Sequence, residues 1–109
     1  SIASQADYYI VDGDNLGLMR TMAGAKGRVI SCGMNCHTAV TASSIDPDSQ
    51  RFIYCLQHGL TTLDGTQVNP QELPVQWDAG HYDVTQVLLG ITTFLVCGIP
   101  LPKQIHFLY

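Results

Sequence analysis

Short β-branched and aromatic runs alternate with a helical pattern in the first third of the chain. Residues 8–11 form an apolar run that ends at Asp-Gly-Asp-Asn, as a buried strand ends at the polar edge of an α/β sheet. Leu16, Met19 and Met22 then recur at helical spacing, which predicts a helix with these three side chains in the core. Residues 28–31 begin a second strand. The pattern therefore predicts two parallel strands joined by a right-handed helical crossover.

The middle of the chain has the pattern of β-hairpins. Residues 39–42 and 51–56 are β-rich runs separated by the turn sequence Asp-Pro-Asp-Ser. A further run at 59–63 reaches an Asp-Gly turn, and residues 73–77 form one more strand. These runs predict a small antiparallel sheet.

The last third is dominated by one long apolar helix. Residues 83–97 are apolar around most of the helical circumference, which is typical of a helix packed between a sheet and other structure. Pro102 can open a short final helix with Ile105 and Leu108 on one face. The sequence thus predicts an α/β fold, with a strand-helix-strand unit, a small antiparallel sheet and a buried C-terminal helix, in a single domain or domain fragment over residues 1–109.

Composition narrows the classes of partner. Hydrophobic residues make up 46% of the 109 residues, which is ordinary for a chain that buries a core, and charged residues only 13%. Nine acidic against five basic side chains leave no basic face for a nucleic acid. The apolar stretch at 84–101 is interrupted by Gln86 and several threonines, so we expect a core helix and no membrane span. Without a secretory signal pattern, the four cysteines are expected to be reduced thiols in a cytoplasmic protein.

Four stretches, taken in order, carry a resemblance to a known family. They are Val11-Asp12-Gly13-Asp14-Asn15, residues 27–35, residues 39–45, and residues 80–101, which end in Gly-Ile-Pro-Leu. Together they resemble the later part of the central ATP-binding domain of the Mur ligases. The resemblance covers nearly the whole chain and implies an ATP- and magnesium-dependent enzyme that adds an amino acid to a UDP-muramyl-type acceptor in peptidoglycan biosynthesis.

The resemblance also implies which residues approach the nucleotide. Asp83 and Gln86 stand where the family has two asparagines near the adenine, and Asp14 follows the strand at the nucleotide side. These substitutions weaken the expectation of adenine binding, because a carboxylate cannot donate a hydrogen bond and glutamine carries its amide one methylene further out. Asn15 or Asp14 can cap the following helix. For Asp14, a cap role is favoured over a role at the nucleotide, because acidic residues that follow a strand more often cap the next helix.

The phosphate-binding Gly-x-x-x-x-Gly-Lys-(Ser/Thr) loop is missing from the sequence. In the family it lies upstream of every matched stretch, as do the magnesium ligands. We therefore expect the chain to lack activity alone, to bind no cofactor by itself, and to work with the remaining domains of a parent ligase. A second interpretation is a degenerate ligase-like scaffold or subunit that has lost ATP binding. Separately, if the upstream half of the domain is missing, one flank of the apolar helix and one edge of the strand pair are uncovered, which favours self-association or docking onto another chain.

A third interpretation is a small zinc-stabilised domain. Cys32, Cys36, Cys55 and His58 supply the ligand types of a structural zinc site with three cysteines and one histidine. Cysteine is also among the most commonly buried residues without any ligand role, so the favoured prediction assigns no metal.

Overall fold

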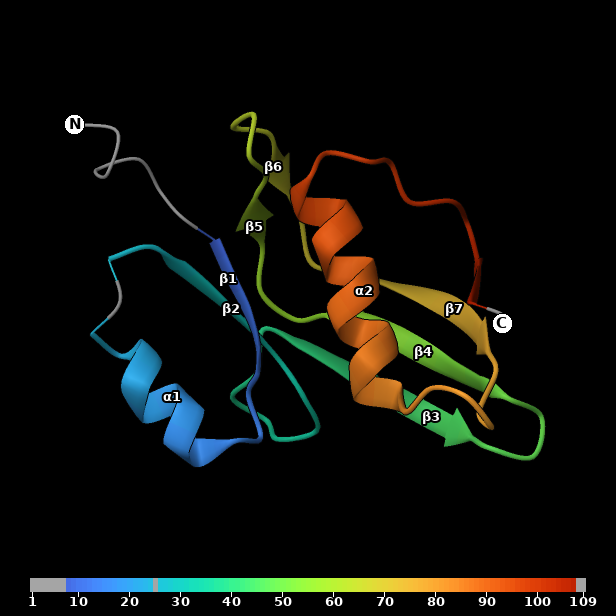
Figure 1. Ribbon diagram of the computed structural model, residues 1–109. Helices are drawn as coiled ribbons and strands as arrows, with labels where there is room; N and C mark the ends of the chain where they lie inside the picture. Colours follow the sequence, from blue (N-terminus) through green and yellow to red (C-terminus); the bar gives the residue numbers. More distant parts are fainter. Residues whose placement is uncertain (1–7, 25, 108–109) are drawn as a thin grey trace.

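The computed structural model describes residues 8–24 and 26–107, which form a six-stranded mixed sheet, a two-stranded sheet and two helices (Figure 1). The larger sheet has the strand order β1-β2-β3-β4-β7-β8, and β5 pairs with β6. In chain order the elements are β1 (Tyr8–Asp12), α1 (Leu16–Met22), β2 (Arg28–Cys32), β3 (Val40–Asp46), β4 (Arg51–Leu56), β5 (Leu60–Thr61), β6 (Gln67–Val68), β7 (Gln71–Trp77), α2 (Val84–Val96) and β8 (Ile105–Phe107).

The predicted strand-helix-strand unit is confirmed. β1 and β2 are parallel, in register from Tyr8 opposite Arg28 to Asp12 opposite Cys32, and α1 connects them. The antiparallel hairpin of β3 and β4 is also confirmed, with β7 antiparallel on the other side of β4. A separate small sheet is not formed by these strands, because Cys32 pairs in parallel with Val40 and joins β2 to β3.

The prediction of a short final helix is wrong. Ile105 to Phe107 form β8, parallel to β7, with Ile105 opposite Val75 and His106 opposite Gln76. Without β8, the outer edge of β7 would leave unpaired backbone groups, and a helix of only a few residues has little stability of its own. Leu108, the second apolar position of the predicted helix, lies outside the described residues.

The core lies between α2 and one face of the large sheet, across which α2 runs (Figure 1). Side chains of β4 and β7 alternate between this face and the opposite one, as period two requires. Full burial of one large apolar side chain contributes roughly 1.5–3 kcal/mol, so this layer supplies most of the stability. The inward-facing residues of these elements are Phe52, Tyr54, Leu56, Leu73, Val75, Trp77, Val87, Leu88, Ile91, Leu95 and Val96.

The predicted core role of α1 is wrong. The helix begins and ends as the spacing indicates, but none of its residues is buried, and Leu16 is 67% exposed. Met19 and Met22 are only half-buried. Since β1 is the end strand of the sheet, α1 has little sheet surface to cover, and its apolar stripe stays partly open.

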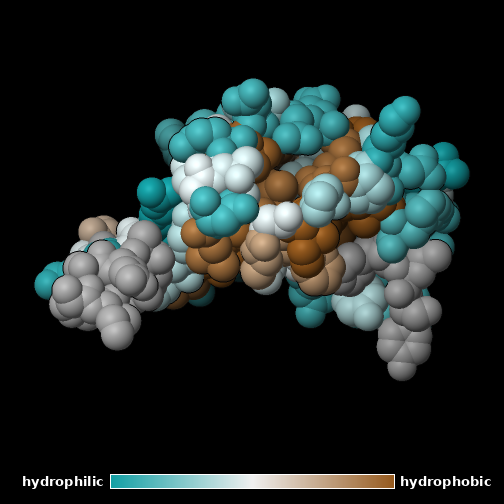
Figure 2. Space-filling model, turned by 90° about the horizontal axis from the view of Figure 1, so that it is seen from above, coloured by the Kyte–Doolittle hydropathy of each residue, from teal (hydrophilic) through white to brown (hydrophobic). Residues whose placement is uncertain are grey.

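Apolar side chains are exposed around the C-terminal end of α2. Phe94 and Ile99 are 52% and 49% exposed, and the Leu63 amide donates to the Val96 carbonyl at 2.9 Å, which brings the β5–β6 turn to the same place. Figure 2 views the molecule from this side and shows apolar surface bordered by hydrophilic side chains.

Candidate functional site

The first turn of α2 holds both residues that the sequence places near an adenine. Asp83 is the N-cap of α2, and its side chain accepts a hydrogen bond from the Gln86 amide at 2.8 Å. In return, Gln86 Oε1 accepts from the Asp83 amide at 2.9 Å. This is a capping box, in which two side chains satisfy two otherwise unpaired amides of the helix end. One oxygen of each side chain is therefore engaged within its own helix, and both residues stay exposed.

The Asp-x-x-Gln spacing ahead of an apolar helix is itself a sequence signature of a capping box. The capping box was not predicted, because Asp83 and Gln86 were compared only with the two asparagines of the Mur ligases. The sequence alone is therefore enough to predict the capping role of these two residues, but it does not predict a role in nucleotide binding.

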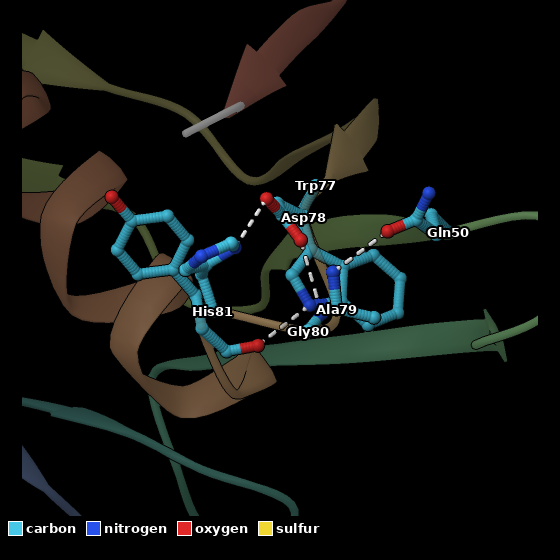
Figure 3. A network of polar contacts seen from close by, with 7 residues as sticks. Gln50, Trp77, Asp78, Ala79, Gly80 and His81 are labelled. Atoms are coloured by element: carbon cyan, nitrogen blue, oxygen red, sulfur yellow. Dashed lines mark hydrogen bonds and ion pairs between the residues drawn. The ribbon is translucent and has the colours of Figure 1, made fainter.

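The turn that leads into α2 is held by a network of polar contacts (Figure 3). Asp78 accepts hydrogen bonds from the Gly80 amide at 3.1 Å and pairs with His81 Nδ1 at 2.6 Å. The Ala79 amide donates to Gln50 Oε1 at 2.9 Å, which ties this turn to the β3–β4 hairpin. The start of α2 is consequently fixed relative to the sheet.

Trp77 ends β7 beneath this turn. Its indole Nε1 donates to the Tyr82 carbonyl at 3.0 Å, and its ring meets Phe52 edge-on with centroids 5.2 Å apart. Only 3% of Trp77 is exposed. The side chain closes the core here, and its face is not open for stacking on a ligand ring.

Asp14 does not cap α1, contrary to the favoured prediction. Asn15 is the N-cap, and its side chain accepts from the Leu18 amide at 3.0 Å, because the residue directly before the first helical position carries the extended backbone that a cap needs. The Asp14 carboxylate instead accepts from the backbone amides of Met34 and Asn35, at 2.8 and 3.1 Å. The Met34 amide is the main cause of a lowered pKa for Asp14.

Asp14 thereby joins the loops that follow the two parallel strands. The Asn35 side-chain amide adds a third hydrogen bond to Asp14, at 2.9 Å, and the Gly13 amide donates to the Cys32 carbonyl at 2.9 Å. A Cβ at Gly33 would lie 2.7 Å from the Asp14 carboxyl carbon, so a larger residue would displace the carboxylate from its hydrogen bonds with the loop. These loops stand at the carboxyl ends of parallel strands, where α/β proteins commonly bind ligands. α2 begins on the side toward which β1 runs (Figure 1).

The four residues of the zinc interpretation are not brought together. Cys32 is fully buried on the α2 side of the sheet, with its Sγ 3.6 Å from Thr92 Oγ1. Cys55 points to the opposite face, with its Sγ 3.5 Å from Ser43 Oγ. Within residues 8–24 and 26–107, no three histidine, cysteine or acidic side chains converge as a metal ion would require.

Neither described helix has the length and apolar character needed to cross a membrane. In comparisons with known proteins, no family model, curated protein or solved structure matches the chain.

Proposed function

We propose that the chain is part of the central domain of a Mur-type ligase, which adds an amino acid to a UDP-muramyl-type acceptor in the cytoplasm. The supporting observation is the element order: a parallel β1-α1-β2 unit, then antiparallel β3, β4 and β7, then α2 with its first turn on the side where β1 ends (Figure 1). ATP and magnesium belong to the complete enzyme, whose phosphate loop would come from another segment. The chain is not competent for catalysis alone.

In this proposal the first turn of α2 faces the nucleotide. Asp83 keeps the helix capped, and the acidic cap replaces an amide that could donate to the adenine. Asp14 holds the loops after β1 and β2 in place, and it acts on nucleotide binding indirectly, through the position of these loops. Adenine affinity is therefore expected to be weak.

Two substitutions at Asp83 separate capping from nucleotide binding. Asparagine and serine both cap helices about as well as aspartate, to within roughly 0.5 kcal/mol, but only asparagine brings an amide donor. We expect Asp83→Asn to bind MgATP several-fold more tightly than Asp83→Ser in calorimetric titrations of the complete gene product. Both variants should unfold at nearly the same temperature.

The proposal fails if the complete gene product, unaltered or as Asp83→Asn, binds no MgATP at millimolar concentration. That outcome would favour the degenerate scaffold, which the capping hydrogen bonds of Asp83 and Gln86 also support.

The expected self-association has a separate test, which uses the exposed apolar residues at the end of α2. Phe94→Ser should abolish concentration-dependent association in sedimentation velocity if this surface joins chains (Figure 2). Leu16→Ser is the matched control, because Leu16 is 67% exposed on α1, a different helix. Equal sedimentation of the unaltered chain at all concentrations would exclude self-association through this patch.

A further inference from the structure

The face of the sheet opposite α2 carries a polar row that crosses three strands. Arg51 of β4 lies opposite Gln76 of β7, and Gln76 lies opposite His106 of β8. Directly paired residues project from the same face of a sheet, and the neighbours Phe52, Val75 and Ile105 are directed to the core. Arg51, Gln76 and His106 therefore stand side by side on the face that α2 does not cover.

A hollow of about 330 Å³ lies over this row. Ile53 and Pro74, a cross-strand pair one row further along, are also among the residues that line it. Ser44 of β3 forms part of the wall, with a φ of 52° next to a β-bulge that shifts the register between Ser43 and Asp46. Bulges bend a strand locally and often stand beside binding sites. The volume is within the range of small-molecule pockets, about 300–1,000 Å³.

The hollow has a positive charge and no negative one among the described residues that line it. Of the described residues that line it, Arg51 alone is permanently charged, and no carboxylate is present. Asp46 lies opposite Arg51 in register, but its carboxylate accepts from the amides of Asp48 and Ser49 at 3.1 and 3.3 Å in the hairpin turn. The single ion pair among the described residues involves His81 and Asp78, so Arg51 has no acidic partner there. A guanidinium that has no acidic partner among the described residues, in a chain of net charge −4, is available to an external anion.

His106 is held beside this cation by its neighbour. The Gln104 side-chain nitrogen lies 2.9 Å from His106 Nε2. If the amide donates this hydrogen bond, the imidazole carries its proton on Nδ1 and can donate from that atom. The row then offers a guanidinium, an amide and an imidazole as donors beside an apolar floor.

The geometry points to a binding site for a small organic anion: a carboxylate or phosphate on Arg51 and His106, with an apolar body against Ile53 and Pro74. The site uses none of the residues implicated in the ligase proposal, so either can fail without the other. A second hollow on the same face carries Glu72 and Cys55 and has the opposite charge, which directs an anion to the Arg51 end.

The test is an NMR titration of the 109-residue chain with phenylacetate and, in parallel, phenyl phosphate. We expect saturable shifts of the backbone amides of Phe52, Gln76 and His106. Phenylacetamide, which has the same apolar body without the charge, should bind at least about fivefold more weakly, since one charge-assisted contact is lost at a half-open site. The tighter of the two anions identifies the preferred headgroup.

Two variants complete the experiment. Arg51→Gln should weaken binding of the anions about fivefold or more, while Glu72→Gln, on the same face in the other hollow, should leave the affinity within about twofold. Equal affinity for phenylacetate and phenylacetamide, no effect of Arg51→Gln, or shifts that depend on protein concentration instead of ligand would each overturn the site. The last outcome would assign the face to a second copy of the chain.

Discussion

A pair of buried hydroxyl groups gives the most direct test of the core. The Tyr54 hydroxyl lies 2.8 Å from Thr92 Oγ1, and both side chains are 0% exposed. Thr92→Val keeps the shape of the side chain and removes its oxygen, which leaves the tyrosine hydroxyl in the core without this partner. A buried polar group that loses its hydrogen bond costs about 1–3 kcal/mol. For a domain of this size, each kcal/mol lowers the unfolding temperature by about 4–8 °C.

The reverse substitution should cost less. In Tyr54→Phe, the Thr92 hydroxyl still receives the Cys32 thiol, 3.6 Å away, and can turn to a carbonyl of the preceding helical turn. The double variant removes both hydroxyls, so the two losses should not add, with a coupling free energy on the order of 0.5–3 kcal/mol.

Urea denaturation followed by circular dichroism measures the four proteins of this cycle. Burial also raises the pKa of Tyr54, so its phenol should remain protonated in an alkaline absorbance titration up to the pH at which the chain unfolds. Additive free energies, or a Thr92→Val variant as stable as the unaltered chain, would show that the hydroxyl pair does not form.

Three further predictions concern single residues. Backbone hydrogen bonds lower the pKa of Asp14 in the folded chain. The carboxylate therefore contributes fully to stability above its unfolded pKa near 4, and this contribution is lost as the pH falls toward its folded pKa. In Asp14→Asn, the urea concentration at the midpoint of unfolding should depend less on pH between about pH 4 and pH 2. Burial raises the pKa of Cys32 to about 11, so iodoacetamide at neutral pH should modify the exposed Cys36 and Cys97 first and Cys32 only after unfolding, as peptide mass spectrometry can show. Gly33→Ala should lower the free energy of unfolding by about 1–3 kcal/mol in chemical denaturation, because its Cβ would meet the Asp14 carboxylate. Gly24→Ala is the control and should be near neutral, since the space around that Cβ is open. Equal effects of the two substitutions would refute the steric account.

Local pattern predicted the elements that have a regular period and a buried face. The strand at 51–56 was found from its β-rich composition, and the long helix near 83–97 from a run that is apolar around most of its circumference, because both are compositions of elements that pack in a core. The hairpin turn before Arg51 was also predicted, since its Asp-Pro-Asp-Ser sequence consists of residues that favour turns. Of the two neighbouring cap candidates, Asn15 caps the helix and Asp14 does not, a difference within the ordinary uncertainty of helix ends.

Elements that depend on distant partners were not predicted. β8 has only three residues, too few to show a period, and it exists because β7 leaves an edge to pair with. A single pair, Cys32 opposite Val40, makes one continuous sheet out of the two predicted ones. The stripe of α1 correctly indicated a helix, but its exposure follows from the place of β1 at the end of the sheet.

The two candidate sites also differ in whether nearby or distant parts of the sequence bring their residues together. Asp83 and Gln86 are three residues apart, so their mutual bonds are a local matter, and the spacing alone accounts for them without a ligand. Arg51, Gln76 and His106 are aligned only by the register of three strands far apart in the sequence, and no local element requires their side chains in that row. A polar outer face follows from strand alternation, but a guanidinium that has no acidic partner in the described part of the chain, beside an amide and an imidazole, does not. The aligned row is for this reason a stronger indication of ligand binding than the capped helix end.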